Sequence, residues 1–396
     1  MSSVQHPRLP LELLLLICQQ TNNRDSLLNL CKTSYAFRVP AQRKLYEDVY
    51  LVGCSPRVIL YWCRVIRRRP DLAIRVKRVR LVSPTTAEVY PEEADRIFLA
   101  LTRCVNILWL ELPYEAATYH SSWLLGAISR MQCPFRLIVF VGGAQTSLED
   151  IRCMLLQQPR LRILHLQSKY LPLDRHFLRR MSDPVGRDPA TVLPYLFAVK
   201  THSPNVEIER HLQRIETDIG DLTPPLARYA ASLTVLNIHF NSSREPELQA
   251  IFAFNRISQL LPNLLHLALA EKAQAKDDCW YIADDSPALT ISRFPRLQTF
   301  TLVTSRISQF NATEPDGTAV HVDDAGAMQM LCRATMLVGS KTLRRLIIGI
   351  QPNEDLRFPE RMFIAAKYPR VSSGVEIRHF CVAKIHPMAV SQFFWT

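Results

Sequence analysis

The most densely clustered charged side chains in this sequence are those of arginine and lysine. The stretch from Arg64 to Arg80 holds eight of them against one acid, Asp71. These eight are Arg64, Arg67, Arg68, Arg69, Arg75, Lys77, Arg78 and Arg80. Guanidinium groups bind phosphates and carboxylates, so the stretch could be a nuclear import signal or a nucleic-acid patch. Val76, Val79 and Leu81 indicate that part of it is a strand, and no zinc-finger or aromatic-interleaved motif accompanies it, so we do not expect nucleic acid as a partner.

Eleven histidines and ten cysteines could in principle supply a base and a nucleophile. The cysteines form no C-x-x-C pair, and the sequence contains neither H-E-x-x-H nor a paired Cys/His spacing typical of metal sites. It also lacks the glycine motifs of nucleotide-binding proteins and the G-x-S-x-G of α/β-hydrolases. A triad assembled from distant residues stays open as an alternative. We expect no enzyme, no cofactor and no metal site.

The composition fits an ordered protein with few tight glycine turns. Of 396 residues, 48% are apolar and 21% are charged, and the net charge is +12. Only 11 residues are glycine, well under half of the usual share of about 7%. The apolar run from Leu13 to Cys18 is too short to cross a bilayer and has no cleavage site behind it. We therefore expect a cytoplasmic and/or nuclear protein with reduced cysteines and no membrane partner.

A six-residue pattern, apolar-x-x-apolar-x-apolar, returns about ten times at intervals centred near 30 residues. Its occurrences are Val76/Val79/Leu81, Val105/Leu108/Leu110, Phe135/Ile138/Phe140, Leu161/Leu164/Leu166, Leu193/Leu196/Ala198, Leu233/Leu236/Ile238, Leu264/Leu267/Leu269, Leu297/Phe300/Leu302, Leu343/Leu346/Ile348 and Ile377/Phe380/Val382. The segments between them read as helices, for example Ser147 to Leu155 and Leu248 to Leu261, and prolines precede several of the patterns. The interval from Thr304 to Asp323 reads as an exposed loop. A helix followed by a short strand, repeated many times, is typical of a solenoid.

The L-x-x-L-x-L pattern resembles the leucine-rich repeat family over about residues 70 to 385. The resemblance implies an α/β fold, an irregular solenoid of about ten strand-helix units. An ordinary α/β domain with similar buried strands is the alternative.

Residues 6 to 51 contain no strand-like repeat and read as three short helices. Pro10 and Glu12 suit the first turn of one helix, and Asp25 can cap the second. A third helical segment runs from Ala41 to Tyr46, after Pro40. So small a unit has too little interior to bury its apolar faces, so it needs a partner surface.

This segment contains four short motifs: Leu9-Pro10-x-Glu12-Leu13, Asp25-x-Leu27-Leu28, Ser34-x-x-Phe37 and Leu45-Tyr46-x-x-Val49-x-Leu51. Together they resemble an F-box, and Ala41-Gln42-Arg43 before Leu45-Tyr46 is similar to the F-box proteins of filamentous fungi. The alternative is a helical cap that covers the end of the repeats. With the repeats, the predicted domains are an F-box at 6–51, a linker or helical connection at 52–74, a leucine-rich-repeat-like solenoid at 75–385 and a C-terminal tail at 386–396.

The two resemblances together imply the substrate receptor of an SCF-type E3 ubiquitin ligase, whose F-box docks on the SKP adaptor and through it on a cullin. A non-catalytic repeat scaffold outside the ubiquitin system is the alternative. The predicted adaptor contacts are Leu9, Pro10, Leu13, Leu14, Ile17, Leu27, Leu28, Leu30 and Phe37. Some of these could instead hold the three helices together.

The x positions of the predicted strands point away from the core, where solenoids bind partners. The predicted substrate contacts among them are Lys77, Arg78, Arg80, Trp109, Arg162, His165, His266, Arg344 and Arg345. The x positions read this way contain no carboxylate. They predict an acidic or phosphorylated protein substrate, with a merely solvated basic face as the alternative.

Overall fold

The computed structural model describes residues 9–21, 23–52, 54–82, 91–112, 128, 133–142, 148–166, 193–201, 211–218, 226–240, 257–271, 293–304, 311–313, 319–321, 341–350, 361–369 and 375–382. The chain divides into two compact units. Unit 1 comprises Met1–Ser168 and Met181–Leu196, and unit 2 comprises Lys169–Arg180 and Phe197–Thr396. The fold is α/β, as predicted, with a mostly parallel sheet and helices at the N-terminus. The division into units falls inside the region predicted as repeats, and the predicted domain boundaries stay predictions.

Three helices open the chain: α1 (Leu11–Gln20), α2 (Arg24–Thr33) and α3 (Tyr35–Glu47). Two differ from the prediction. Asn23, and not Asp25, caps α2, because its Oδ1 accepts hydrogen bonds from the backbone N–H groups of Asp25 (2.8 Å) and Ser26 (3.2 Å). The third helix begins at Tyr35 and contains Pro40, where the prediction had it begin after that proline.

The three-helix unit has a small interior. Cys18, Leu27 and Ala41 are buried at its centre. The side chains packed around them are half-buried, namely Leu30, Cys31, Phe37 and Leu45. This core is small for three helices, in agreement with the expectation that so short a segment cannot bury all of its apolar residues.

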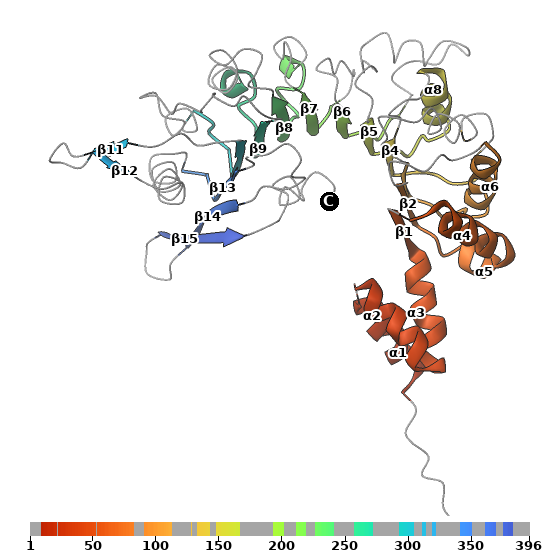
Figure 1. Ribbon diagram of the computed structural model, residues 1–396. Helices are drawn as coiled ribbons and strands as arrows, with labels where there is room; N and C mark the ends of the chain where they lie inside the picture. Colours follow the sequence, from red (N-terminus) through yellow and green to blue (C-terminus); the bar gives the residue numbers. More distant parts are fainter. Residues whose placement is uncertain are drawn as a thin grey trace, which may run out of the picture. The chain divides into compact units, whose positions relative to one another are not determined.

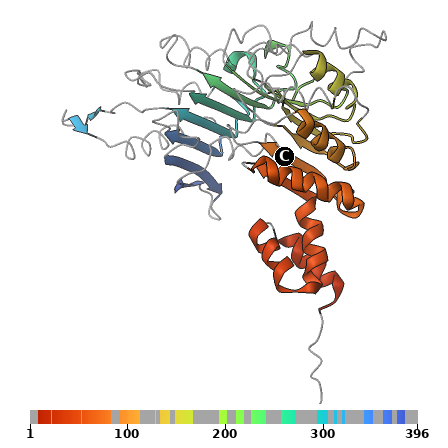
Figure 2. The same ribbon diagram turned by 45° about the vertical axis from the view of Figure 1, so that its right-hand side comes forward.

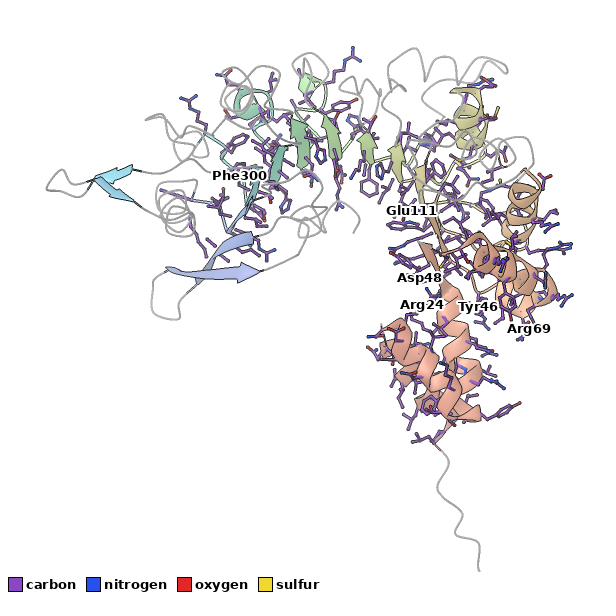
Figure 3. All side chains as sticks on the ribbon, in the orientation of Figure 1. Arg24, Tyr46, Asp48, Arg69, Glu111 and Phe300 are labelled. Atoms are coloured by element: carbon purple, nitrogen blue, oxygen red, sulfur yellow. The ribbon has the colours of Figure 1, made fainter. Side chains whose placement is uncertain are left out.

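Strand β1 (Asp48–Val52) follows α3 without a linker and begins the sheet of unit 1. Five parallel strands lie in the order β1, β2 (Arg78–Val82), β3 (Trp109–Glu111), β4 (Val139–Gly142) and β5 (Ile163–Leu166). Helices α4 (Pro56–Arg68), α5 (Pro70–Ala73), α6 (Pro91–Leu101) and α8 (Leu148–Leu156) connect them and lie on one side of this sheet (Figure 1). The guanidinium of Arg24 on α2 donates a hydrogen bond to the carbonyl of Tyr50 (2.8 Å), which ties the helices to β1 (Figure 3).

The sheet of unit 2 has a parallel part and an antiparallel end. Its parallel strands are β6 (Ala198–Thr201), β7 (Arg214–Asp218), β8 (Val235–Phe240), β9 (His266–Glu271), β10 (Thr299–Thr304) and β13 (Arg345–Ile350). Two antiparallel strands follow, β14 (Arg361–Pro369) and β15 (Val375–Val382). The stretch predicted as a loop, Thr304 to Asp323, instead contains a two-stranded antiparallel pair, β11 (Asn311–Thr313) and β12 (Ala319–His321).

One backbone arrangement recurs between neighbouring parallel strands. Two successive N–H groups donate to a single carbonyl of the preceding strand's turn, as Leu108 and Trp109 do to Lys77 (2.8 and 3.1 Å). In unit 2, Leu265 and His266 donate in the same way to Thr234 (2.9 and 3.0 Å). Because the arrangement fixes which residues lie opposite one another, it also fixes which side chain of each strand enters the core.

The register confirms some predicted patterns and corrects others. Leu161/Leu164/Leu166, Leu233/Leu236/Ile238 and Leu264/Leu267/Leu269 are buried as predicted, as are Val76/Val79/Leu81. Phe300 is buried on β10 (Figure 3).

Three patterns are wrong by two or three residues. The core positions are Ile107/Leu110/Leu112, Leu137/Phe140/Gly142 and Leu196/Val199/Thr201. The pattern Ile377/Phe380/Val382 lies on the antiparallel strand β15, so it is not a parallel repeat.

The sequence analysis did not predict two of the strands. Residues 6 to 51 were expected to lack a strand, yet Tyr46-x-x-Val49-x-Leu51 supplies β1, whose Val49 and Leu51 pair with Val79 and Leu81 of β2. Leu212/Ile215/Thr217 supplies β7, which lies between β6 and β8. The long predicted interval from 193 to 233 therefore contains a further strand.

Candidate functional site

Helices α1 to α3 pack together near the N-terminal end of the chain (Figure 2). Their apolar side chains are exposed to an unusual extent for so small a unit. Monomeric proteins rarely leave large contiguous apolar patches open to water, and such patches mark interaction sites. The exposed large apolar side chains here are Leu9, Leu11, Leu13, Leu16, Ile17, Leu28, Tyr35 and Val39. We call these eight residues the apolar patch. Tyr35 is the most exposed of them, at 84%.

The structure divides the predicted adaptor contacts into two groups. Leu9, Pro10, Leu13, Ile17 and Leu28 are exposed. The other group lies inside or against the core of the three helices: Leu14, Leu27, Leu30 and Phe37. Leu14 and Leu27 are buried and hold the helices together, which is the alternative that the sequence analysis left open for some of these residues. Sequence reasoning missed Leu11, Leu16, Tyr35 and Val39, because helical spacing alone did not say which apolar side of each helix faces the others.

A stack of aromatic and cationic groups covers the face of unit 1 that carries Arg78, Arg80 and Trp109. The guanidinium carbons of Arg78 and Arg80 each lie 5.6 Å from the centroid of the Trp109 ring. Arg80 also lies 5.8 Å from the ring of Tyr50 on β1. At these distances the cations interact with the ring faces. The predicted contacts Arg78, Arg80 and Trp109 are therefore brought together, and Tyr50 is a member that the prediction missed.

Carboxylates accompany these cations, which contradicts the expected all-basic face. Glu111 on β3 lies 4.0 Å from Nε of Arg80, and Asp48 on β1 lies opposite Arg78 in the register (Figure 3). Burial raises the pKa of Glu111, and the charge of Arg80 opposes that rise. Because the prediction placed the β3 pattern two residues too early, it did not include Glu111 among the outward positions.

The positive charge of Lys77 is also balanced by a nearby carboxylate. Its Nζ lies 2.5 Å from Oε1 of Glu47, the last residue of α3. The hydrogen bond from Lys77 holds the pKa of Glu47 below its usual value, against the opposing effect of burial. Of the other predicted contacts in unit 1, Arg162 is exposed and His165 is half-buried.

The densest basic stretch does not form one surface. Arg64, Arg67 and Arg68 are exposed on α4, whereas Ile59, Trp62, Cys63 and Ile66 of the same helix are buried. Arg69 is paired with Asp71 through two hydrogen bonds of 2.8 Å. Arg78 and Arg80 belong to β2 and lie with Trp109 on the sheet. The stretch is thus shared between a helix and a strand with different surroundings.

A buried carboxylate organises one end of unit 2. Only 3% of the Glu216 side chain is exposed, and it contacts three groups on neighbouring strands. Its Oε1 lies 2.5 Å from Nζ of Lys200 and 3.0 Å from Nε2 of His239, and Asn237 donates to its Oε2 (3.1 Å). Burial raises the pKa of Glu216, but the charge of Lys200 and the contact with His239 outweigh burial and hold the pKa well below the usual range. We call these four residues the Glu216 cluster.

A second group in unit 2 lies along one cross-strand row of the register, and we call it the unit-2 row. From β7 to β13 it reads Arg214, Val235, His266, Thr299 and Arg345. Residues at the same register level of a parallel sheet point to the same face, so the three basic residues lie on one side. Burial, and then the charges of Arg214 and Arg345, lower the pKa of His266. The predicted contacts His266 and Arg345 belong to this row, Arg344 is exposed just before β13, and Arg214 was missed with its strand.

Three buried cysteines have unreactive surroundings. Burial raises the pKa of Cys63 and Cys104 to about 12 and that of Cys133 to about 11. Thiols with such pKa values stay protonated at neutral pH and are poor nucleophiles. Within the ranges that the structure describes, no three His, Cys, Asp or Glu side chains are arranged to hold a metal ion.

None of the described helices combines the length and the apolar character needed to cross a membrane. A scan of the chain against models of known protein families finds no match, and a search of curated proteins finds no similar sequence.

Proposed function

We propose that the chain is the substrate-recognition subunit of an SCF-type E3 ubiquitin ligase. In this proposal α1 to α3 form an F-box that docks on the SKP adaptor, which connects it to a cullin. The parallel strands belong to an irregular leucine-rich-repeat solenoid that binds a protein substrate. The observation that carries the proposal is the apolar patch of eight exposed side chains on three short helices.

Physical reasoning supports docking at this patch. Exposed leucine side chains gain roughly 1.5 to 3 kcal/mol each when a partner covers them fully. The small core of Cys18, Leu27 and Ala41 keeps the helices together while their other apolar side chains stay outside. The recurring backbone hydrogen bonds support the interpretation as repeats, because successive parallel strands are joined by the same pair of N–H groups donating to one carbonyl.

The receptor itself would do no chemistry. By holding a substrate beside the ubiquitin-charged enzyme of the ligase, it would raise the effective concentration of the substrate lysine. The rate gain would come from proximity, so neither an activated cysteine nor a metal would be required of this chain.

The test is co-purification of the SKP adaptor with the tagged full-length protein. Replacing Leu13 and Ile17 together with Asp should reduce adaptor recovery at least about tenfold, because truncating central apolar anchors typically costs more than 1 kcal/mol each. Replacing Leu9 and Pro10 with charged residues should act in the same direction. Gln20→Asp is the matched control, because it adds a charge at an exposed polar position of the same helix.

Adaptor recovery that is equal for Leu13→Asp/Ile17→Asp and for Gln20→Asp would exclude the patch as the docking site. If the unaltered protein recovers no adaptor at all, the ligase proposal fails, and a repeat scaffold outside the ubiquitin system takes its place.

A further inference from the structure

Arg214 and Arg345 of the unit-2 row make no ion pair with any carboxylate of the described residues. Between β7 and β13 its members are Arg214, Val235, His266, Thr299 and Arg345, none of which is acidic. The nearest described carboxylate along β7, Glu216, is already in contact with Lys200, Asn237 and His239. Unit 1 differs, because its cations Lys77 and Arg80 each have a glutamate within 4.0 Å.

Arg214 is the least satisfied member of the row. Its Nη1 atom is buried and has no hydrogen-bond partner, and its guanidinium carbon lies 5.6 Å from the Phe197 ring. Burial lowers the pKa of Arg214, and no acidic group opposes this effect. A buried donor without a partner costs roughly 1 to 3 kcal/mol, and more when the group is charged. A buried donor of this kind needs an explanation, and an ion or ligand that would accept its hydrogen bond is one.

The spacing of the row suits a group that lies between two arginines. Neighbouring strands are about 4.8 Å apart, so Arg214 and Arg345 each lie about 10 Å from His266, on opposite sides of it. The intervening residues, Val235 and Thr299, have side chains much shorter than arginine and are buried, which fits long side chains of the neighbouring strands lying over them. Two guanidinium groups bind a phosphate monoester well, since its charge of about −1.5 to −2 balances both of them. A carboxylate would balance only one.

We propose that Arg214, His266 and Arg345 form a binding site for a phosphate group carried by a partner polypeptide. Arg214 and Arg345 donate charge-assisted hydrogen bonds to the phosphate oxygens, and the imidazole of His266 forms the floor of the site. As a substrate contact the site rests on the proposed receptor function, which it makes more specific by naming a phosphorylated side chain as the recognised group.

The test measures binding of two probes to the purified chain by calorimetry, in the absence of any adaptor. The probes are N-acetyl-O-phosphoserine amide and N-acetyl-glutamate amide. The phosphoserine probe should bind the unaltered protein, and the glutamate probe should bind at least about tenfold more weakly, because it lacks one charge and one oxygen.

Arg214→Met should weaken phosphoserine binding at least about tenfold, because it removes charged hydrogen bonds. Without ligand the same variant should melt at an equal or higher temperature than the unaltered protein, since the uncompensated buried charge is gone. A residue with a purely structural role would not show this combination. Arg296→Met is the matched control, because Arg296 is an exposed arginine of the same unit that lies outside the row. Should Arg214→Met fail to fold, Arg345→Gln is used in its place, with the same expected loss.

Failure of the phosphoserine probe to bind the unaltered protein would overturn the site. Equal binding by Arg214→Met and Arg296→Met would do so too, and equal binding of the glutamate probe would overturn the choice of phosphate. All three results leave adaptor recovery untouched, so they are distinguishable from failure of the proposed ligase function.

Discussion

At the scale of single residues, Glu216 is the most strongly perturbed carboxylate in the described part of the chain. Its ionised form is held by Lys200, His239 and Asn237, which come from the strands on either side of β7. Because the folded pKa lies well below the value of about 4.3 for a free glutamate, the stabilisation is fully present above that value. It is lost as the pH falls through the folded pKa.

Glu216→Gln should therefore destabilise the protein at neutral pH by roughly 1 to 3 kcal/mol, because it leaves two basic side chains without their partner. The difference from the unaltered protein should shrink as the pH falls below about 4. Unfolding by urea, followed by circular dichroism at pH 7 and at successively lower pH, measures both effects. Glu149→Gln is the control, because that exposed glutamate of α8 interacts with Arg152 and Cys153 of the same helix and bridges no strands. A difference that is independent of pH would contradict the assignment.

At the scale of elements, the sequence predicted that short strands recur but did not predict their register. Around β3, Val105-x-x-Leu108-x-Leu110 and Ile107-x-x-Leu110-x-Leu112 both match the pattern, since apolar residues are frequent. Only the pairing of Leu110 with Val79 and Phe140 selects the second frame. The wrong frame also gave a wrong set of outward-facing residues, because it did not include Glu111 among them.

The same limit applies to the first and the last strands. Tyr46-x-x-Val49-x-Leu51 fits the repeat pattern, but it also ends the residues that resemble an F-box, so the sequence analysis placed it in the helical segment alone. The pattern at Ile377 is locally indistinguishable from the others, yet β15 runs antiparallel to β14. Strand direction depends on the path of the preceding chain, which a six-residue pattern does not contain.

The corrected register of β3 predicts opposite outcomes for two neighbouring substitutions. Ile107 is fully buried, whereas Val105 is 44% exposed. Ile107→Ala should lower the free energy of unfolding by about 2 to 5 kcal/mol, because it opens a cavity in the core. Val105→Ala should change it by less than about 0.5 kcal/mol. Urea unfolding of both variants measures the difference, and a larger loss for Val105→Ala than for Ile107→Ala would favour the earlier frame.

At the scale of the whole molecule, the basic net charge is distributed in two different ways. In unit 1 the sheet cations are compensated, Lys77 by Glu47 and Arg80 by Glu111, and Arg78 and Arg80 also contact the Trp109 ring. In unit 2 Lys200 and His239 contact Glu216, whereas Arg214 and Arg345 make no ion pair with a carboxylate of the described residues. The net charge of +12 therefore does not by itself place the proposed acidic partner. The proposal places it at Arg214 and Arg345.

This difference between the units predicts that substitutions in unit 2, and not in unit 1, weaken the binding of an anion. Replacing Arg78 and Arg80 together with Gln should lower stability by roughly 1.5 to 3 kcal/mol, because it removes three cation–π contacts of about 0.5 to 1 kcal/mol each. It should leave binding of N-acetyl-O-phosphoserine amide within about twofold of the unaltered protein, since a twofold change is only about 0.4 kcal/mol. Arg345→Gln should do the reverse, with weaker binding and little loss of stability. Calorimetric binding and thermal melting of the two variants, measured side by side at one ionic strength, separate these effects. If Arg78→Gln/Arg80→Gln weakens phosphoserine binding as much as Arg345→Gln does, then anion recognition is not confined to unit 2, and the distribution of carboxylates does not decide where the partner binds.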